Sequence, residues 1–101
     1  MWFITVFEKI EQDDVTKLID FGYQRTWGYY SEKECAVKAL HENWTDMMET
    51  SYNYAVIEEY EEGISNYLFN RQWFKWDDEL GGYFEIEEPE CVKCYGCYAI
   101  G

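Results

Sequence analysis

The segment that most constrains the fold of this chain runs from residue 31 to residue 50 and reads SEKECAVKALHENWTDMMET. Ser31 is a favourable N-cap, and Glu34 follows at the spacing of a capping box, in which each side chain bonds a backbone N–H of the first turn. Small and apolar residues recur at helical spacing along one side, together with one Asn: Ala36, Ala39, Leu40, Asn43 and Met47. These features predict a helix over residues 31–50.

The runs on either side of this helix are rich in Tyr, Trp, Phe, Ile and Val, which favour strands. They predict strands over residues 2–11, 24–30, 52–60, 70–77 and 83–88. The first of these carries bulky side chains on both faces, as a central strand does. Residues 78–82 predict a hairpin turn, and residues 11–20 predict a loop or a short helical turn. The order ββαβββ predicts an α+β fold in which one helix packs on one face of an antiparallel sheet of about five strands.

The size and composition of the chain predict a single folded domain over residues 1–101, with a cysteine-containing tail at residues 91–101. A hydrophobic content of 48% excludes a disordered chain. The chain also holds 10 Tyr, 5 Trp and 6 Phe, more than a core of this size needs. Several rings are therefore expected at the surface, where aromatic side chains commonly anchor interfaces.

The ends of the chain and its cysteines indicate a cytoplasmic location. The N-terminal run MWFITVFEKIE has neither the basic region nor the cleavage site of a signal peptide. No apolar run approaches the roughly 20 residues that span a bilayer. Four cysteines in this context suit a reducing cytoplasm better than an exported disulfide scaffold.

The charge of the chain is strongly negative and unevenly distributed. It has 21 acidic residues against 8 Lys and Arg, a formal net charge of −13, which repels nucleic acid and anionic membranes and attracts basic surfaces. Residues 39–70 and residues 76–92 each contain seven acidic residues and no Lys or Arg. The alternative interpretation is that these acids only keep a small protein soluble.

If the two acidic blocks lie on neighbouring surfaces, they form one negative patch with aromatic rings set among the carboxylates. Glu85 and Glu87 would repeat at ~6.6 Å along a strand, a spacing similar to that of successive phosphates. Such a patch could occupy a Lys- and Arg-lined groove built for DNA or RNA. The residues expected to contact such a partner are Glu58, Glu59, Tyr60, Glu61, Glu62, Trp76, Asp77, Asp78, Tyr83, Glu85 and Glu87.

Three cysteines in the tail raise a separate hypothesis of metal binding. Cys91, Cys94 and Cys97 form two overlapping CxxC spacings that could supply three thiolates to a structural Zn²⁺, with Cys35 or His41 as the fourth ligand. A zinc site more often uses two separate pairs, so a redox pair or free thiols remain the alternatives. No other cofactor is expected.

No arrangement of residues predicts catalysis. Asp77 with Asp78, and Glu87 with Glu88, are sequence neighbours whose side chains would point to opposite faces of a strand. The run DDELGG lacks the ligand pattern of an EF-hand, and no glycine-rich phosphate loop is present. His41 has no nucleophile at a recognisable spacing. The chain is therefore predicted not to be an enzyme.

Several runs of residues resemble a family of small acidic proteins of unknown function from Firmicute bacteria, their phages and mobile elements. The resemblance spans most of the chain and rests on RTWGYYS, HEN, YNYAVIEEYEEG, QWFKWD, YFEIEEPE and the terminal YAIG. These motifs are aromatic and structural, so the resemblance implies no active site. It implies a mobile-element setting in a bacterial host cell, in which short acidic proteins often inhibit host defence, as anti-CRISPR proteins do.

The expected function is therefore that of an acidic, non-enzymatic inhibitor that occupies a basic nucleic-acid-binding groove of a host defence nuclease such as a CRISPR effector. Direct binding to nucleic acid or to a membrane is not expected. The alternative is a small cytoplasmic regulatory or structural domain that self-associates, for example as a homodimer, through its exposed aromatic residues.

Overall fold

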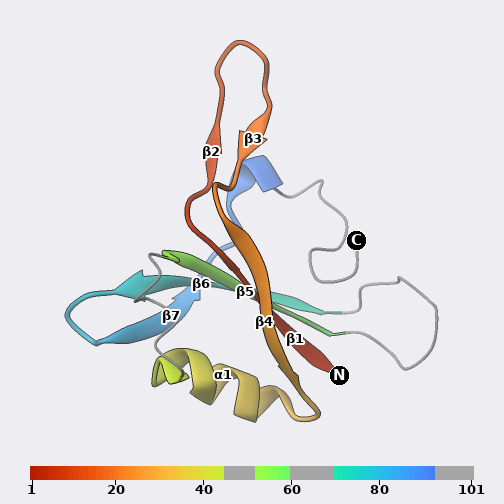
Figure 1. Cartoon of the computed structure of the whole chain (residues 1–101), viewed down its shortest axis with the longest axis vertical. Coiled ribbons are helices and arrows are strands. Elements are labelled where there is room, and N and C mark those ends of the chain that lie inside the picture. Colours follow the sequence, from red (N-terminus) through yellow and green to blue (C-terminus); the bar gives the residue numbers. More distant parts are fainter. Residues whose placement is uncertain (45–51, 60–69, 93–101) are drawn as a thin grey trace.

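The computed structural model describes residues 1–44, 52–59 and 70–92 of the chain. In this part the strands are β1 (Trp2–Phe7), β2 (Glu11–Gln12), β3 (Ile19–Asp20), β4 (Gln24–Tyr30), β5 (Tyr54–Glu59), β6 (Arg71–Asp77) and β7 (Gly82–Ile86). The helices are α1 (Lys33–His41) and a short 3₁₀ helix, η2 (Glu90–Val92). Five strands form an antiparallel sheet in the order β4-β1-β5-β6-β7, and α1 packs on one of its faces (Figure 1). The predicted α+β fold is confirmed.

Residues 11–20 depart from the prediction of a loop or a helical turn. They form a separate hairpin in which β2 pairs with β3. β1 accordingly ends at Phe7, earlier than predicted, because the chain leaves the main sheet to enter this hairpin. β4 occupies residues 24–30 as predicted.

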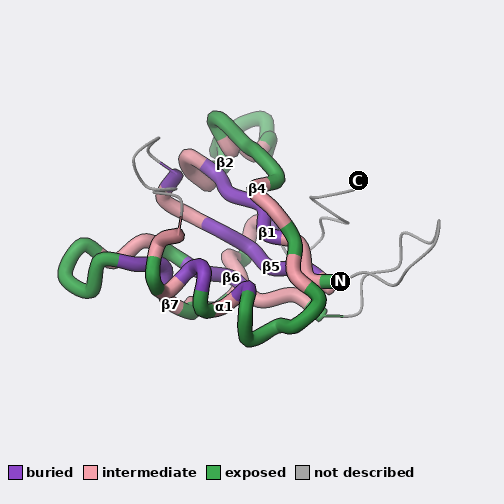
Figure 2. Tube along the Cα trace, turned by 60° about the horizontal axis from the view of Figure 1, so that its bottom comes forward, coloured by how far each residue is buried: buried purple, intermediate pink, exposed green. Residues whose placement is uncertain are grey.

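Both faces of the main sheet are buried, as the bulky residues on both sides of β1 predict. Ile4 and Val6 of β1 belong to a cluster on the α1 side of the sheet. Phe7 belongs to a second cluster on the opposite side, together with Val56, Trp73 and Val92 of η2. Buried residues run along β1 and β5 in the middle of the sheet (Figure 2). Side chains of residues 4–7 in β1 and 55–58 in β5 are therefore buried on both faces of the sheet.

The helix is shorter than its sequence pattern predicts. Its N-cap is Glu32 rather than Ser31, and no side-chain hydrogen bond caps this end, so the predicted capping box is wrong. The helix ends at His41 because Asn43 has a φ of 49°, the left-handed conformation that commonly terminates helices. Residues 45–51, including Met47, lie outside the described residues.

The C-terminal end of α1 is fixed against β7. The ring of His41 stacks on Phe84 with centroids 4.6 Å apart, and its Nε2 lies 2.7 Å from Oε1 of Glu85. Residue 82 must be small, because a Cβ on Gly82 would overlap the carbonyl group of His41. Within the described ranges, no helix has the length and apolarity to cross a membrane.

Candidate functional site

The hairpin formed by residues 11–20, here called the hairpin arm, stands away from the main sheet (Figure 1). Residues 11–18 and residue 20 are all exposed, and Ile19 is half-buried near the base. The arm carries four carboxylates, against the single positive charge of Lys17: Glu11, Asp13, Asp14 and Asp20. It is therefore a projecting and strongly anionic element.

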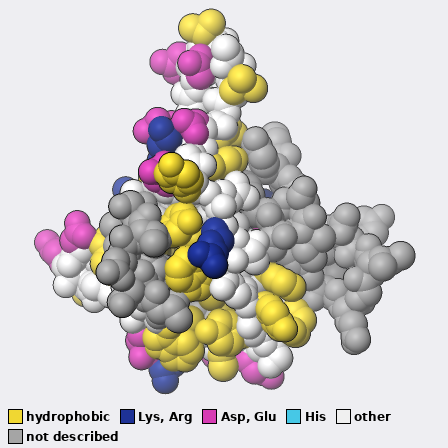
Figure 3. Space-filling view, viewed as in Figure 1, with side chains coloured by type: hydrophobic (Ala, Val, Ile, Leu, Met, Phe, Trp, Pro, Cys, Tyr) yellow, Lys and Arg dark blue, Asp and Glu magenta, His cyan; other side chains and the backbone are white. Residues whose placement is uncertain are grey.

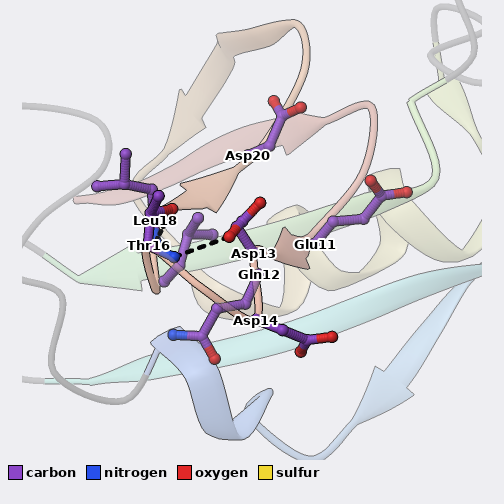
Figure 4. Close-up of a pocket in the computed structure, with 8 residues that line it drawn as sticks. Glu11, Gln12, Asp13, Asp14, Thr16, Leu18 and Asp20 are labelled. Carbon is purple, nitrogen blue, oxygen red and sulfur yellow. Dashed lines mark hydrogen bonds between the residues drawn. The ribbon is translucent and has the colours of Figure 1, made fainter.

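Asp13 organises the turn at the end of the arm. Its Oδ1 accepts hydrogen bonds from the backbone N–H groups of Val15 and Thr16, each at 2.8 Å. Figure 4 shows the bond from Thr16 as a dashed line. Its carbonyl oxygen accepts the N–H of Lys17 at 2.9 Å, and Lys17 adopts a left-handed φ of 62°. The two backbone donors favour the ionised carboxylate, so the pKa of Asp13 lies below its ordinary value.

Asp20 holds the base of the arm in a similar way. Its Oδ1 accepts the N–H of Gly22 at 2.8 Å, and its Oδ2 lies 3.1 Å from Nζ of Lys9. The hydrogen bond from Gly22, followed by the contact with Lys9, lowers the pKa of Asp20. Asp13 and Asp20 are consequently held in their charged forms, which suits the binding of cationic groups better than proton transfer near neutral pH.

The arm encloses a shallow depression of about 550 Å³ (Figure 4). The residues that line it are Glu11, Gln12, Asp13, Asp14, Thr16, Leu18, Ile19 and Asp20. Leu18 is 72% exposed and Val15, at the turn, is 89% exposed. A second depression, of about 400 Å³ along α1, mixes the basic Lys33 and Lys38 with the acidic Glu34 and Glu42, so it has no dominant charge.

The turn at residues 77–81 repeats the hydrogen bonds of the turn at residues 13–17. Oδ1 of Asp77 accepts the N–H groups of Glu79 at 2.9 Å and Leu80 at 3.1 Å. Its carbonyl oxygen accepts the N–H of Gly81 at 2.9 Å, and Gly81 has a left-handed φ of 70°. The prediction of a hairpin turn after β6 is confirmed. The shared Asp-Asp pair at residues 13–14 and 77–78 is the sequence signal that could have identified the hairpin arm.

Two residues predicted to face a partner are buried, and for these the prediction is wrong. Glu58 is fully buried, because β5 is a middle strand with both faces covered, and its Oε2 lies 3.5 Å from Nη2 of Arg71. Tyr83 is also fully buried and donates its hydroxyl to the carbonyl oxygen of Tyr52 at 2.5 Å. Burial raises the pKa of the Tyr83 hydroxyl, so it stays neutral.

Arg71 ties two acidic residues into the body of the protein. Besides its contact with Glu58, its Nη1 lies 3.2 Å from Oε2 of Glu88, which also accepts the indole N–H of Trp73 at 3.0 Å. The side chain of Arg71 is only 10% exposed. Glu58 and Glu88 therefore serve internal ion pairing across β5, β6 and the segment after β7.

The remaining predicted residues within the described ranges are at least partly accessible. Glu59 accepts a hydrogen bond from Asn70 at 2.6 Å, and half-buried Trp76 donates its indole N–H to Asp78 at 2.6 Å. Asp77 serves the turn described above, Glu85 contacts His41, and Glu87 is exposed. Tyr60, Glu61 and Glu62 lie outside the described residues.

That the two acidic blocks form one surface stays a prediction, because Asp46, Glu49, Glu61 and Glu62 of the first block lie outside the described residues. In Figure 3 acidic side chains appear at the hairpin arm and at the β6–β7 turn, which project from different parts of the molecule. Among the described Tyr side chains the two most exposed are Tyr23, just before β4, and Tyr29, within β4. Negative charge is thus presented on separate projections.

The cysteines leave the zinc hypothesis untested. Cys91 is half-buried in η2 and Cys35 is exposed on α1, whereas Cys94 and Cys97 lie outside the described residues. Across residues 1–44, 52–59 and 70–92, no group of three or more His, Cys, Asp or Glu side chains is placed to hold a metal ion.

Comparison with known proteins found no family model, no curated protein and no solved structure that matches this chain.

Proposed function

We propose that this protein binds, through exposed carboxylates, a basic surface that a partner protein uses to hold nucleic acid. The observation that carries the proposal is the hairpin arm, a projecting element on which four carboxylates and one Lys are exposed, with Lys9 at its base in contact with Glu11 and Asp20. All four exposed carboxylates are charged near neutral pH. Their natural counterparts are the Lys and Arg side chains that line nucleic-acid grooves.

The proposed action is inhibition by occupancy, without catalysis. A host defence nuclease, and first of all a CRISPR effector, is the partner class that the sequence resemblance implies. A net charge of −13 steers the protein towards such a basic groove and away from nucleic acid and anionic membranes. Secondary contacts are assigned to the accessible residues of the predicted set: Glu59, Trp76, Asp77, Asp78, Glu85 and Glu87.

The test is displacement of labelled target DNA from purified CRISPR effector–guide complexes, followed by fluorescence anisotropy at increasing ionic strength. The expected result is competitive displacement that weakens steeply with salt, because exposed charge pairs are screened over about 10 Å at 0.1 M. Full activity of every effector in the presence of the protein would contradict the proposal.

A matched pair of charge-reversal variants locates the contact. Glu11→Lys with Asp14→Lys alters the arm, whereas Glu32→Lys with Glu34→Lys makes the same change in net charge on exposed positions at the start of α1. The arm variant is expected to lose at least about tenfold in inhibition, and the α1 variant about twofold or less. Equal losses would show that only total charge matters.

Self-association is the second candidate function, and exposed rings favour it. Tyr23, just before the edge strand β4, is 74% exposed, and Tyr29, near the end of β4, is 60% exposed. A bulge at Trp27, where the register with β1 shifts, and the charge of Arg25 both hinder the addition of another strand to this edge. Sedimentation equilibrium of the wild type and of Tyr29→Ser tests it, since a dimer built on these rings would dissociate in the variant.

A further inference from the structure

The turn of the hairpin arm displays two apolar side chains that make no contribution to the core. Val15 and Leu18 are 89% and 72% exposed. The buried cluster on this side of the sheet receives Ile10, Ile19 and Phe21 from the base of the arm and nothing from residues 11–18. Removing the outer part of the arm would therefore leave the described core intact, so the two apolar residues are not explained by folding.

The backbone that carries these two side chains is held by local hydrogen bonds. The N–H of Val15 is bonded to Asp13, and the N–H of Leu18 is bonded to Oγ1 of Thr16 at 3.3 Å. Across the arm, the side-chain amide of Gln12 donates to the carbonyl oxygen of Lys17 at 3.1 Å. A preformed element loses less conformational entropy on binding than a flexible loop does.

The charges beside these apolar groups define the partner surface that would fit them. Leu18 lies in the same depression as the carboxylates of Glu11, Asp13, Asp14 and Asp20. An apolar group beside carboxylates is complementary to an apolar pocket with Lys and Arg at its rim. A phosphate backbone or an anionic membrane would instead be repelled by these carboxylates.

We propose that Val15 and Leu18 enter an apolar pocket in the floor of the partner's basic groove, while the carboxylates of the hairpin arm pair with the Lys and Arg side chains at its rim. This inference rests on the proposed function of the acidic arm and names the feature of the partner that the arm recognises. The carboxylates direct the approach, and the apolar pair supplies contact that salt does not screen.

The test uses near-isosteric polar substitutions in the full chain. Val15→Thr with Leu18→Asn removes the apolar tip, and Leu80→Asn is the control, because Leu80 is a 63% exposed apolar residue in the matching β6–β7 turn. Inhibition is measured by the same DNA displacement from CRISPR effector–guide complexes. Circular dichroism and thermal unfolding verify that each variant keeps the wild-type fold.

The tip variant is expected to lose at least about tenfold in inhibition, and the control about twofold or less. This ratio should stay constant as salt rises, whereas the loss caused by Glu11→Lys with Asp14→Lys should shrink. Unchanged inhibition by the tip variant would overturn the apolar pocket and leave the acidic contact in place. If the wild type displaces DNA from none of the effectors, both proposals are overturned.

Discussion

Two turns with the same hydrogen bonds close the β2–β3 and β6–β7 hairpins, yet their surroundings differ. Asp13 and Asp77 each accept two backbone N–H groups on Oδ1, and each turn ends in a left-handed residue, Lys17 in one and Gly81 in the other. The strands beside Gly81 belong to the five-stranded sheet, whereas β2 and β3 have two residues each and stand apart. The same pattern of hydrogen bonds thus forms a turn supported by the core in one place and the turn of a projecting arm in the other.

The largest change in the free energy of unfolding should come from substituting charged residues of the main sheet rather than those of the hairpin arm. Arg71→Leu removes the cation that lies 3.5 Å from the buried carboxylate of Glu58, which is expected to lower the free energy of unfolding by about 3–5 kcal/mol. Asp14→Leu removes an exposed charge and should change it by about 0.5 kcal/mol or less. Urea denaturation measures both, and similar losses would show that the arm is part of the stable core.

Substitution of a glycine should cost more beside the turn that the core supports, at Gly82, than at the base of the hairpin arm, at Gly22. Gly82→Ala should lower the free energy of unfolding by about 3 kcal/mol, because the new methyl group must displace the backbone of His41. At the base of the arm, Gly22→Ala meets a Glu8 side chain that can move, so the cost is mainly that of its φ of 63°, about 1–2 kcal/mol. Thermal unfolding measures both losses of stability. A larger loss for Gly22→Ala than for Gly82→Ala would contradict this ranking.

Exchanging the left-handed residues tests whether the two turns are equivalent. Gly81→Lys should lower the free energy of unfolding by about 1 kcal/mol, and Lys17→Gly should relieve a similar strain in the arm. Because the arm can open without unfolding the sheet, the second effect should appear as slower amide hydrogen exchange at residue 17, with little change in global stability. Equal global shifts of opposite sign would show that the arm unfolds together with the sheet.

The smallest expected effect is a pH dependence confined to the arm. The pKa values of Asp13 and Asp20 are lower in the folded chain than in the unfolded one, so their stabilisation is complete above the unfolded pKa of about 3.9. It is lost as pH falls through the folded pKa values. NMR titration of the carboxyl carbons should place both midpoints below the ordinary Asp value, and Asp13→Ala should abolish acid loosening of the turn.

The helix and the predicted site show how far local patterns reach. The composition around residues 33–41 correctly indicated a helix, but a left-handed Asn43 ended it earlier than the apolar spacing suggested. The seven-acid blocks suggested one surface, but Glu58 and Glu88 pair with Arg71 instead. Whether a strand carboxylate faces water depends on what covers that face of the sheet. The sequence of the strand itself does not predict this covering.

By itself, the sequence determined the α+β class, the position of β4, the turn after β6 and the large negative charge. These follow from strand periodicity, turn chemistry and composition, which act over a few neighbouring residues. Only the tertiary structure decided that Glu58 and Tyr83 are buried and that residues 11–20 project as an acidic arm. Burial arises from strands that are distant in sequence but adjacent in the sheet, so it appears only once the chain has folded.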